Sequence, residues 1–259
     1  MAGLFHKLRH PCRCYVVCTI PRSGSNLLTD GLRATRRAGM PKQFFLAKFE
    51  SRFAAELGLD PNGDYATYVR GVVNSKTTHN EVFGFKLMSW YLDEFLKRLR
   101  ETHGFGNSAT SDLELLRGAF PYLRFVRLVR RHKLRQALST ARALQTGLWK
   151  VQEGKRSLRE PEFDPDLIEQ SLREAERQEK IWDNFFRRIE VKPFLVEYEK
   201  LCQDYETTIH AVLDFLRIKL PSNTRVGTPV TTRQADEISR IWEKRFLTER
   251  PSAYSPAHG

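Results

Sequence analysis

The sequence of 259 residues has little cysteine and no long hydrophobic run. Its four cysteines, three of which lie between positions 12 and 18, do not form the two C-x-x-C pairs of a structural zinc site. No stretch approaches the ~20 consecutive apolar residues of a membrane-spanning helix. The first 13 residues are basic and lack the apolar run of a signal peptide. We therefore expect a cytoplasmic protein with free thiols and no bound metal.

The sequence also lacks the signatures of the main classes of nucleotide-binding and nucleic-acid-binding proteins. It has no G-x-x-x-x-G-K-[ST] loop, whose lysine and magnesium-binding hydroxyl a nucleotide kinase or GTPase requires. It has no recognition-helix, OB-fold or RRM pattern, so specific nucleic-acid binding is not expected. A basic nucleic-acid-binding protein remains an alternative on charge alone, because the net charge is +12.

The positive charge is concentrated in one part of the chain. Residues 121–160 contain 11 Lys or Arg residues and 2 acidic residues. Such a region can bind phosphate groups, nucleic acid or an anionic membrane surface. A solvated basic face without a ligand would show the same composition.

Apolar runs rich in β-forming residues alternate with segments of helical spacing. This alternation predicts a single α/β domain with a central, mostly parallel sheet flanked by helices. We assign residues 1–13 to a basic N-terminal segment, 14–249 to the domain and 250–259 to a loose tail. The predicted strands are Tyr15–Ile20, Val82–Leu87, Arg124–Val129 and Phe194–Tyr198, and the predicted helices are Asn26–Ala38, Asp64–Asn74, Ser89–Thr102, Lys133–Gln145, Asp164–Ile189, Gln203–Leu216 and Arg233–Phe246.

The first predicted strand is followed by a short loop that resembles a phosphate-binding loop physically. Gly24 allows the backbone to turn sharply, and the N–H groups at the start of the next helix form a cradle for an anion. Arg22 adds a fixed positive charge beside it. A capped helix start without a ligand would have a similar sequence. The residues expected to bind the anion are Arg22, Ser23, Gly24, Ser25 and Asn26.

A second anion site is predicted after the third strand. Arg130 stands at the end of that strand, and Ser139 lies nine residues further, on the predicted helix. On its own, Ser139 would be interpreted as a helix serine that bonds to its own backbone. Two anion sites in one fold indicate a ligand with two anionic ends, such as a nucleotide phosphorylated at its 5′ and 3′ positions.

Six motifs, in this order, resemble those of the bacterial trehalose 2-sulfotransferase family, which belongs to the sulfotransferases that use 3′-phosphoadenosine 5′-phosphosulfate (PAPS). The similarity extends over most of the chain. The motifs are P-R-S-G-S at Pro21–Ser25, A-G-M-P-K-Q-F-F at Ala38–Phe45, G-F-K-L-M at Gly84–Met88, Arg130 with Q-A-L-S at Gln136–Ser139, R-A-L-Q-T at Arg142–Thr146 with Trp149, and R-Q-A-D at Arg233–Asp236.

The resemblance implies that the protein transfers a sulfuryl group from PAPS to a hydroxyl without a metal. It implies that the loop at 22–26 binds the 5′-phosphosulfate, and that Arg130 and Ser139 hold the 3′-phosphate. It places Arg233 and Gln234 in a loop that closes over the donor. Lys86 would reach the sulfuryl group or the acceptor, unless it faces solvent.

The sequence departs from the family pattern at Gln43, where the resembled motif has a glutamate that acts as the general base. An amide has no basic site that accepts a proton at neutral pH. Glu50 or His79 could be the base instead, or Gln43 could orient the acceptor in a loose transition state. The third alternative is a weakly active or non-catalytic protein that binds 3′-phosphoadenosine nucleotides.

By resemblance, the acceptor is a hydroxyl of a carbohydrate or glycolipid. Aromatic residues could stack on its sugar rings, although core packing explains any single one of them better. The basic segment 150–160 could cover the acceptor or make peripheral contact with an anionic membrane, and an oligomer is compatible with the sequence. The aromatic candidates are Phe44, Phe45, Trp90 and Trp149.

Overall fold

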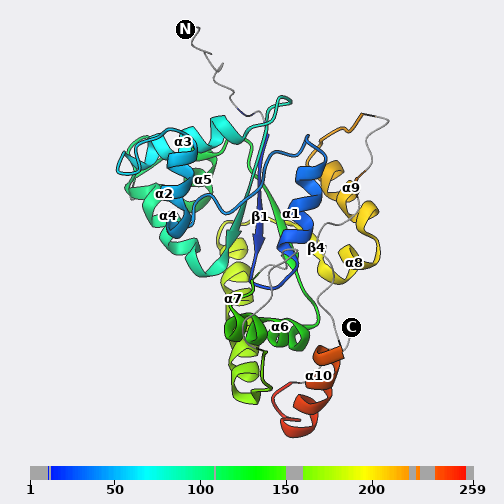
Figure 1. Cartoon of the computed structure of the whole chain (residues 1–259). Helices are drawn as coiled ribbons and strands as arrows, with labels where there is room; N and C mark the ends of the chain where they lie inside the picture. Colours follow the sequence, from blue (N-terminus) through cyan, green and yellow to red (C-terminus); the bar gives the residue numbers. More distant parts are fainter. Residues whose placement is uncertain are drawn as a thin grey trace.

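A sheet of four parallel strands runs through the centre of the protein, and helices cover both of its faces (Figure 1). The computed structural model describes residues 11, 13–107, 109–149, 160–221, 226–227 and 237–254. The neighbouring strands all pair in parallel, in the order β2-β1-β3-β4. This confirms the predicted α/β class. The strands are β1 (Arg13–Thr19), β2 (Val82–Met88), β3 (Arg124–Val129) and β4 (Phe194–Glu197).

The helices form one layer on each face of the sheet and a third group at one end (Figure 1). One face is covered by α2 (Ala47–Glu56), α3 (Tyr65–Lys76), α4 (Leu92–Glu101), α5 (Asp112–Ala119) and α7 (Pro165–Arg188). The other face is covered by α1 (Ser25–Ala34), α8 (Tyr198–Gln203) and α9 (Tyr205–Phe215). The third group joins α6 (Lys133–Thr146) and α10 (Glu237–Glu249) to part of α7.

The central strand β1 is buried on both faces, as the apolar run of its sequence predicts. Its side chains alternate between the two cores, because successive residues of a strand point to opposite faces. Cys14, Val16 and Cys18 contribute to the core under α2–α5. Tyr15 and Val17 contribute to the core under α1 and α9.

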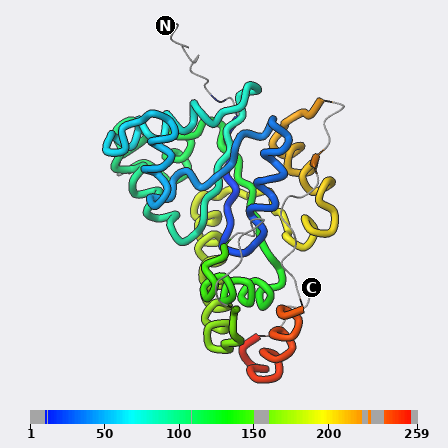
Figure 2. Tube along the Cα trace, viewed as in Figure 1, coloured from blue at the N-terminus to red at the C-terminus, as the bar shows by residue number. Residues whose placement is uncertain are grey.

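The strands end together at one edge of the sheet. Thr19 and Met88, the last residues of β1 and β2, are partners in the parallel register. The loops after β1, β2 and β3 therefore meet at this carboxyl edge, where ligands of open α/β sheets bind. In Figure 2 the green helix α6 lies next to the end of the blue strand β1 at this edge.

All four predicted strands are present, with ends that differ by two residues at most. The predicted helix from Ser89 divides into a short 3-10 helix (Ser89–Tyr91) and α4, and the predicted strand residue Tyr198 begins α8. The sequence interpretation missed α2, α5 and α8. Helix α5 carries a capping box between Ser111 and Glu114, a signal that the sequence does contain.

The C-terminal part of the chain is anchored by ion pairs and ring contacts. Arg250, inside the predicted tail, donates to Asp166 at 2.6 Å and to Glu169 at 3.3 Å. Tyr254 packs on the cluster formed by α6, α7 and α10. Residues 255–259 lie outside the described residues, as do 233–236 at the predicted start of the last helix.

Candidate functional site

The loop after β1 has a backbone that two residues hold in the left-handed region. Arg22 has φ 59° and Gly24 has φ 86°, so the chain turns sharply into α1. A Cβ on Gly24 would lie 2.2 Å from Cδ2 of Tyr198, so the close packing of that ring also requires glycine. Gly24 is the N-cap of α1 and makes no side-chain cap, which leaves the first-turn N–H groups oriented toward this edge.

The two predicted anion sites are adjacent in the structure. Nε of Arg22 donates to Oγ of Ser139 at 2.8 Å, across 117 positions of sequence. Nη1 of Arg130 donates to the carbonyl oxygen of Arg22 at 3.2 Å. Gln136, on the same helix as Ser139, donates from Nε2 to the carbonyl of Pro21 at 2.7 Å. The loop, the end of β3 and α6 therefore form one basic site.

Two partly buried arginines give this site its positive charge. Burial, and then the charge of Arg130, lower the pKa of Arg22 to about 10. Burial also lowers the pKa of Arg130, whose guanidinium lies 4.6 Å from the centre of the Tyr198 ring. The Nε atom of Arg130 is buried and has no hydrogen-bond partner among the described residues. An anion placed here would satisfy that donor and favour the charged forms of both arginines.

Lys86 is part of the same site. It is only 6% exposed, and its Nζ lies 2.9 Å from Oδ1 of Asn26 and 3.3 Å from Oγ of Ser25. The alternative of a solvent-facing lysine is therefore wrong. Lys86 extends from β2 across the sheet edge to the first turn of α1, next to where an anion on that helix start would lie.

Ser23 differs from its neighbours in the loop. It is fully buried, and its hydroxyl donates to the carbonyl of Ile20 at 2.8 Å and also bonds to the hydroxyl of Thr19. The side chain of Ser23 therefore holds the loop on the end of β1. Ser25 and Asn26, in contrast, lie beside Lys86.

Gln43 lies next to Lys86. The segment that carries it runs along β2, and the N–H of Lys86 donates to the carbonyl of Lys42 at 2.9 Å. Burial raises the pKa of the Tyr91 hydroxyl, and a hydrogen bond with the side chain of Gln43 opposes that effect. The same hydroxyl donates to the carbonyl of Lys86 at 3.2 Å. Gln43, Tyr91 and Lys86 thus form one hydrogen-bonded group beside the loop.

The two alternative bases lie elsewhere or are already paired. His79 precedes β2 and hydrogen-bonds to Arg37, at the amino ends of the strands. The Lys86 ammonium lies at the opposite, carboxyl edge, beside Asn26, and the seven-residue strand β2 separates the two edges by about 20 Å. His79 therefore cannot act on the same substrate atom as Lys86. Glu50, on α2, accepts a hydrogen bond from Nη1 of Arg98 at 2.7 Å in a salt bridge.

The aromatic candidates separate into two pairs. Phe44 and Phe45 are 0% and 2% exposed and pack with other phenylalanines in the core under α2–α5, so they cannot stack on a sugar. Trp90 and Trp149 are 49% and 45% exposed. Trp90 is the second residue after the carboxyl end of β2, and its ring lies edge-on to that of Tyr91 with 4.9 Å between the ring centres. The carbonyl of Trp149 accepts a hydrogen bond from Arg22 at 2.6 Å.

Sequence reasoning missed Tyr198, whose ring lies between Gly24 and Arg130. The rule that ligands bind at the carboxyl ends of parallel strands could have indicated it, because Tyr198 follows the fourth strand directly. The sequence-predicted residues Arg233 and Gln234 lie outside the described residues, as does the basic segment 150–159.

Three of the four cysteines, Cys14, Cys18 and Cys202, are free thiols, and Cys12 lies outside the described residues. Within the described ranges no group of three or more His, Cys, Asp or Glu residues could hold a metal ion. None of the helices in those ranges is both long and apolar enough to cross a membrane.

The parallel sheet, the loop that opens α1 and the buried cations around it form a basic site at the carboxyl edge, and such a site suits an anionic group. Residues 14–249 match the family model of the Stf0 sulphotransferases, and the chain belongs to that family of sulfuryl-transferring proteins. It is similar to the trehalose 2-sulfotransferase of Mycobacterium tuberculosis (strain Erdman), with 29% identity over 264 residues that cover 92% of this chain and 96% of that protein.

A second relative is the trehalose 2-sulfotransferase of Mycolicibacterium smegmatis, with 27% identity over 263 residues that cover 92% of this chain and 95% of that protein. Among solved structures, the sulfotransferase domain from the curacin biosynthetic pathway is 14% identical with a TM-score of 0.49. The match covers 96% of this chain and 94% of that domain. The sulfotransferase domain from the Synechococcus PCC 7002 olefin synthase is 16% identical with a TM-score of 0.46, and the match covers 96% of this chain and 91% of that domain.

Proposed function

We propose that this protein transfers the sulfuryl group of PAPS to a hydroxyl of a carbohydrate or glycolipid. The observation that carries the proposal is the joined basic site, in which Arg22 bonds to Ser139 and Arg130 bonds to the loop. A nucleotide with anionic groups at its 5′ and 3′ positions fits two adjoining groups of buried donors. Family membership and the trehalose 2-sulfotransferase relatives support the reaction and a sugar acceptor.

The residues present fit such a donor, because Nε of Arg130 is a buried donor without a partner among the described residues. In this proposal the first-turn N–H groups of α1, with Ser25 and Asn26, hold the 5′-phosphosulfate. Arg130 and Ser139 hold the 3′-phosphate, and Arg22 lies between the two ends. PAPS supplies a sulfuryl group on a phosphate leaving group. Arg233 and Gln234 are proposed to close over it.

Charge stabilisation is the main contribution that this chain would make to the reaction. As the sulfur–oxygen bond breaks, negative charge grows on the bridging oxygen, and fixed donors stabilise it without having to reorganise. Lys86 and Arg22 are the cations beside the first turn of α1. Both are held by hydrogen bonds to neighbouring residues, so their charges are fixed before the substrates bind.

The acceptor hydroxyl must lose a proton, and Gln43 cannot take it. In the proposed reaction, the Gln43 amide orients the hydroxyl, and Tyr91 fixes the amide. General-base assistance contributes about 10²–10⁴ in rate, so transfer without it is slower than with a carboxylate at this position. Gln43 also favours a second function, the binding of 3′-phosphoadenosine nucleotides without efficient transfer.

The half-exposed Trp90 is the proposed sugar-stacking residue, because it lies two residues after β2 and its ring packs edge-on against Tyr91. The trehalose 2-sulfotransferase relatives make trehalose the first acceptor to assay. An anionic membrane surface that presents a glycolipid acceptor is a compatible setting for the basic segment 150–160.

The assignment of Arg130 to the 3′-phosphate is tested by the substitution Arg130→Gln. We expect it to weaken binding of 3′,5′-bisphosphoadenosine by about 10–100-fold, because a buried charge-assisted contact is lost. Binding of adenosine 5′-monophosphate, which lacks the 3′-phosphate, should change less than threefold. Isothermal titration calorimetry with both ligands measures the difference.

The matched control is Arg131→Gln, which removes the same charge from the next residue. The side chain of Arg131 is 66% exposed and pairs with Glu197. We therefore expect the Arg131→Gln variant to bind both nucleotides with affinities near those of the unchanged protein. Equal weakening of both ligands by Arg130→Gln, or an equal effect of Arg131→Gln, would show that Arg130 does not bind the 3′-phosphate.

A further inference from the structure

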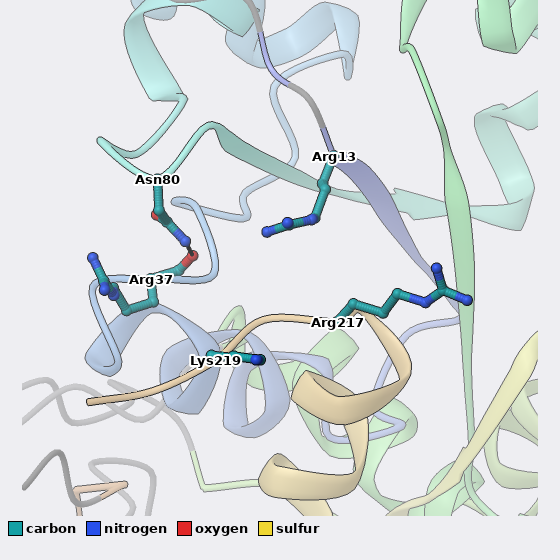
Figure 3. A pocket seen from close by; sticks show the side chains of 5 residues that line it. All are labelled: Arg13, Arg37, Asn80, Arg217 and Lys219. Atoms are coloured by element: carbon teal, nitrogen blue, oxygen red, sulfur yellow. Dashed lines mark hydrogen bonds between the residues drawn. The ribbon is translucent and has the colours of Figure 1, made fainter. Parts of the chain in front are cut away.

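A second basic hollow lies at the amino ends of the strands, on the edge opposite the candidate site. Its volume is about 250 Å³, and five residues line it: Arg13, Arg37, Asn80, Arg217 and Lys219 (Figure 3). They come from the start of β1, the segment after α1, the turn before β2 and the segment after α9. Figure 3 shows Arg13 extending into the space between the turn of Asn80 and the segment of Lys219.

Four of the five lining residues are cations, and none of the four forms an ion pair with a carboxylate in the part of the chain that the structure describes. Glu81, the acidic residue next to Asn80, is exposed and does not line the hollow. Burial lowers the pKa of Arg124, at the start of β3, and the charges of Arg217 and Arg13 lower it further. The cations of this edge therefore create a common positive potential, which favours an anion.

Two buried polar atoms at the hollow also lack partners among the described residues. They are Nε of Arg37, a donor, and Oδ1 of Asn80, an acceptor. The Nδ2 atom of Asn80 donates to the carbonyl of Arg37 at 2.8 Å, which fixes the orientation of the amide. A ligand that satisfies both atoms carries an anionic oxygen for Arg37 and a hydroxyl for Asn80.

We propose that this hollow binds a phosphorylated polyol, either free or as the headgroup of a lipid. A phosphate monoester carries close to two negative charges at neutral pH and three acceptor oxygens, which suits several guanidinium groups at once. The neighbouring hydroxyl of the polyol reaches Oδ1 of Asn80. The seven-residue strand β1 separates this hollow from the first loop by about 20 Å, so one small ligand cannot occupy both. The proposal does not depend on the proposed function.

The test is a titration of the full chain, labelled with ¹⁵N, with glucose 6-phosphate as the probe. Backbone and side-chain amide signals of Asn80, Arg217 and Lys219 should shift in a saturable manner. Signals of Gly24 and Arg130 report separately on the candidate site at the carboxyl edge. In a parallel measurement, the protein is sedimented with phosphatidylcholine vesicles that contain or lack phosphatidylinositol 4-phosphate.

The double substitution Arg217→Gln with Lys219→Gln removes two exposed cations from the hollow and should weaken binding at least tenfold. The control, Lys48→Gln with Lys244→Gln, removes the same charge from exposed positions on α2 and α10. Circular dichroism and a melting curve for each variant show that it is folded.

Saturable shifts at the hollow that the double substitution weakens and the control does not would support a free phosphorylated polyol. Binding only to vesicles with the phosphorylated lipid, lost in the same variant, would support a lipid headgroup. The proposal is overturned if neither probe binds at the hollow, if glucose 6-phosphate shifts only the signals of Gly24 and Arg130, or if the double variant binds as tightly as the control.

Discussion

The substitution Lys86→Met should lower kcat for sulfuryl transfer by about 10²–10³-fold, the range measured when one donor to a developing negative charge is removed. Methionine has a similar length and no charge, so it fills the 6% exposed position of Lys86 without leaving a cavity. The lost charge lies beside Ser25 and Asn26, at the first turn of α1. A radiochemical assay with ³⁵S-labelled PAPS and trehalose measures the rate.

The matched control for this prediction is Lys42→Met. Lys42 is exposed and is joined to Lys86 through its backbone carbonyl, which the substitution leaves in place. Its variant should keep kcat within about threefold of the unchanged protein. A folded Lys86→Met protein with a similarly small change would mean that Lys86 only positions the loop.

The substitution Gln43→Glu should raise kcat by at least about tenfold, because it places a proton acceptor next to Lys86 and Tyr91. A carboxylate acts as a base only when deprotonated. The rate of the variant should therefore rise with pH through the pKa of the new carboxyl, whereas the unchanged protein has no such step at this position. The pH profile distinguishes general-base catalysis from a change in acceptor affinity.

Two further variants make this second prediction specific. Gln43→Leu removes the amide without adding a base and should lower kcat, since the acceptor is no longer oriented. Gln203→Glu adds the same charge at an exposed position at the end of α8 and should leave kcat unchanged. Equal rates for the Glu and Leu variants at every pH would show that the acceptor hydroxyl does not lie beside residue 43.

The sequence predicted the sheet well because the strands are short apolar runs buried by helices on both sides. Once the strands are parallel, the loops after the first three must meet at one edge, which is why Arg22, Lys86 and Arg130 could be expected near each other. The motifs at Pro21–Ser25, Gly84–Met88 and Gln136–Ser139 contributed because they lie at the end of a strand or on the helix that follows one.

Other features of the site depend on packing that no local pattern encodes. Ser23 and Ser25 are two residues apart, yet one is buried under the loop and the other lies beside Lys86, because the left-handed turns at Arg22 and Gly24 set their directions. The contact of Arg22 with Ser139 joins positions 117 residues apart. Helix α2 was missed because only Phe53 and Ala54 of its ten residues are buried, too few for a clear apolar period.

The most direct test of the central claim is a set of melting curves with 3′,5′-bisphosphoadenosine, compared with ATP and GTP in the presence of magnesium. A ligand present at 100 times its Kd stabilises the folded state by about 2.7 kcal/mol, which a melting curve resolves clearly. We expect stabilisation by the bisphosphate and little by the triphosphates. No response to the bisphosphate, or a larger response to ATP with magnesium, would contradict the assignment of the joined basic site to a PAPS-type donor.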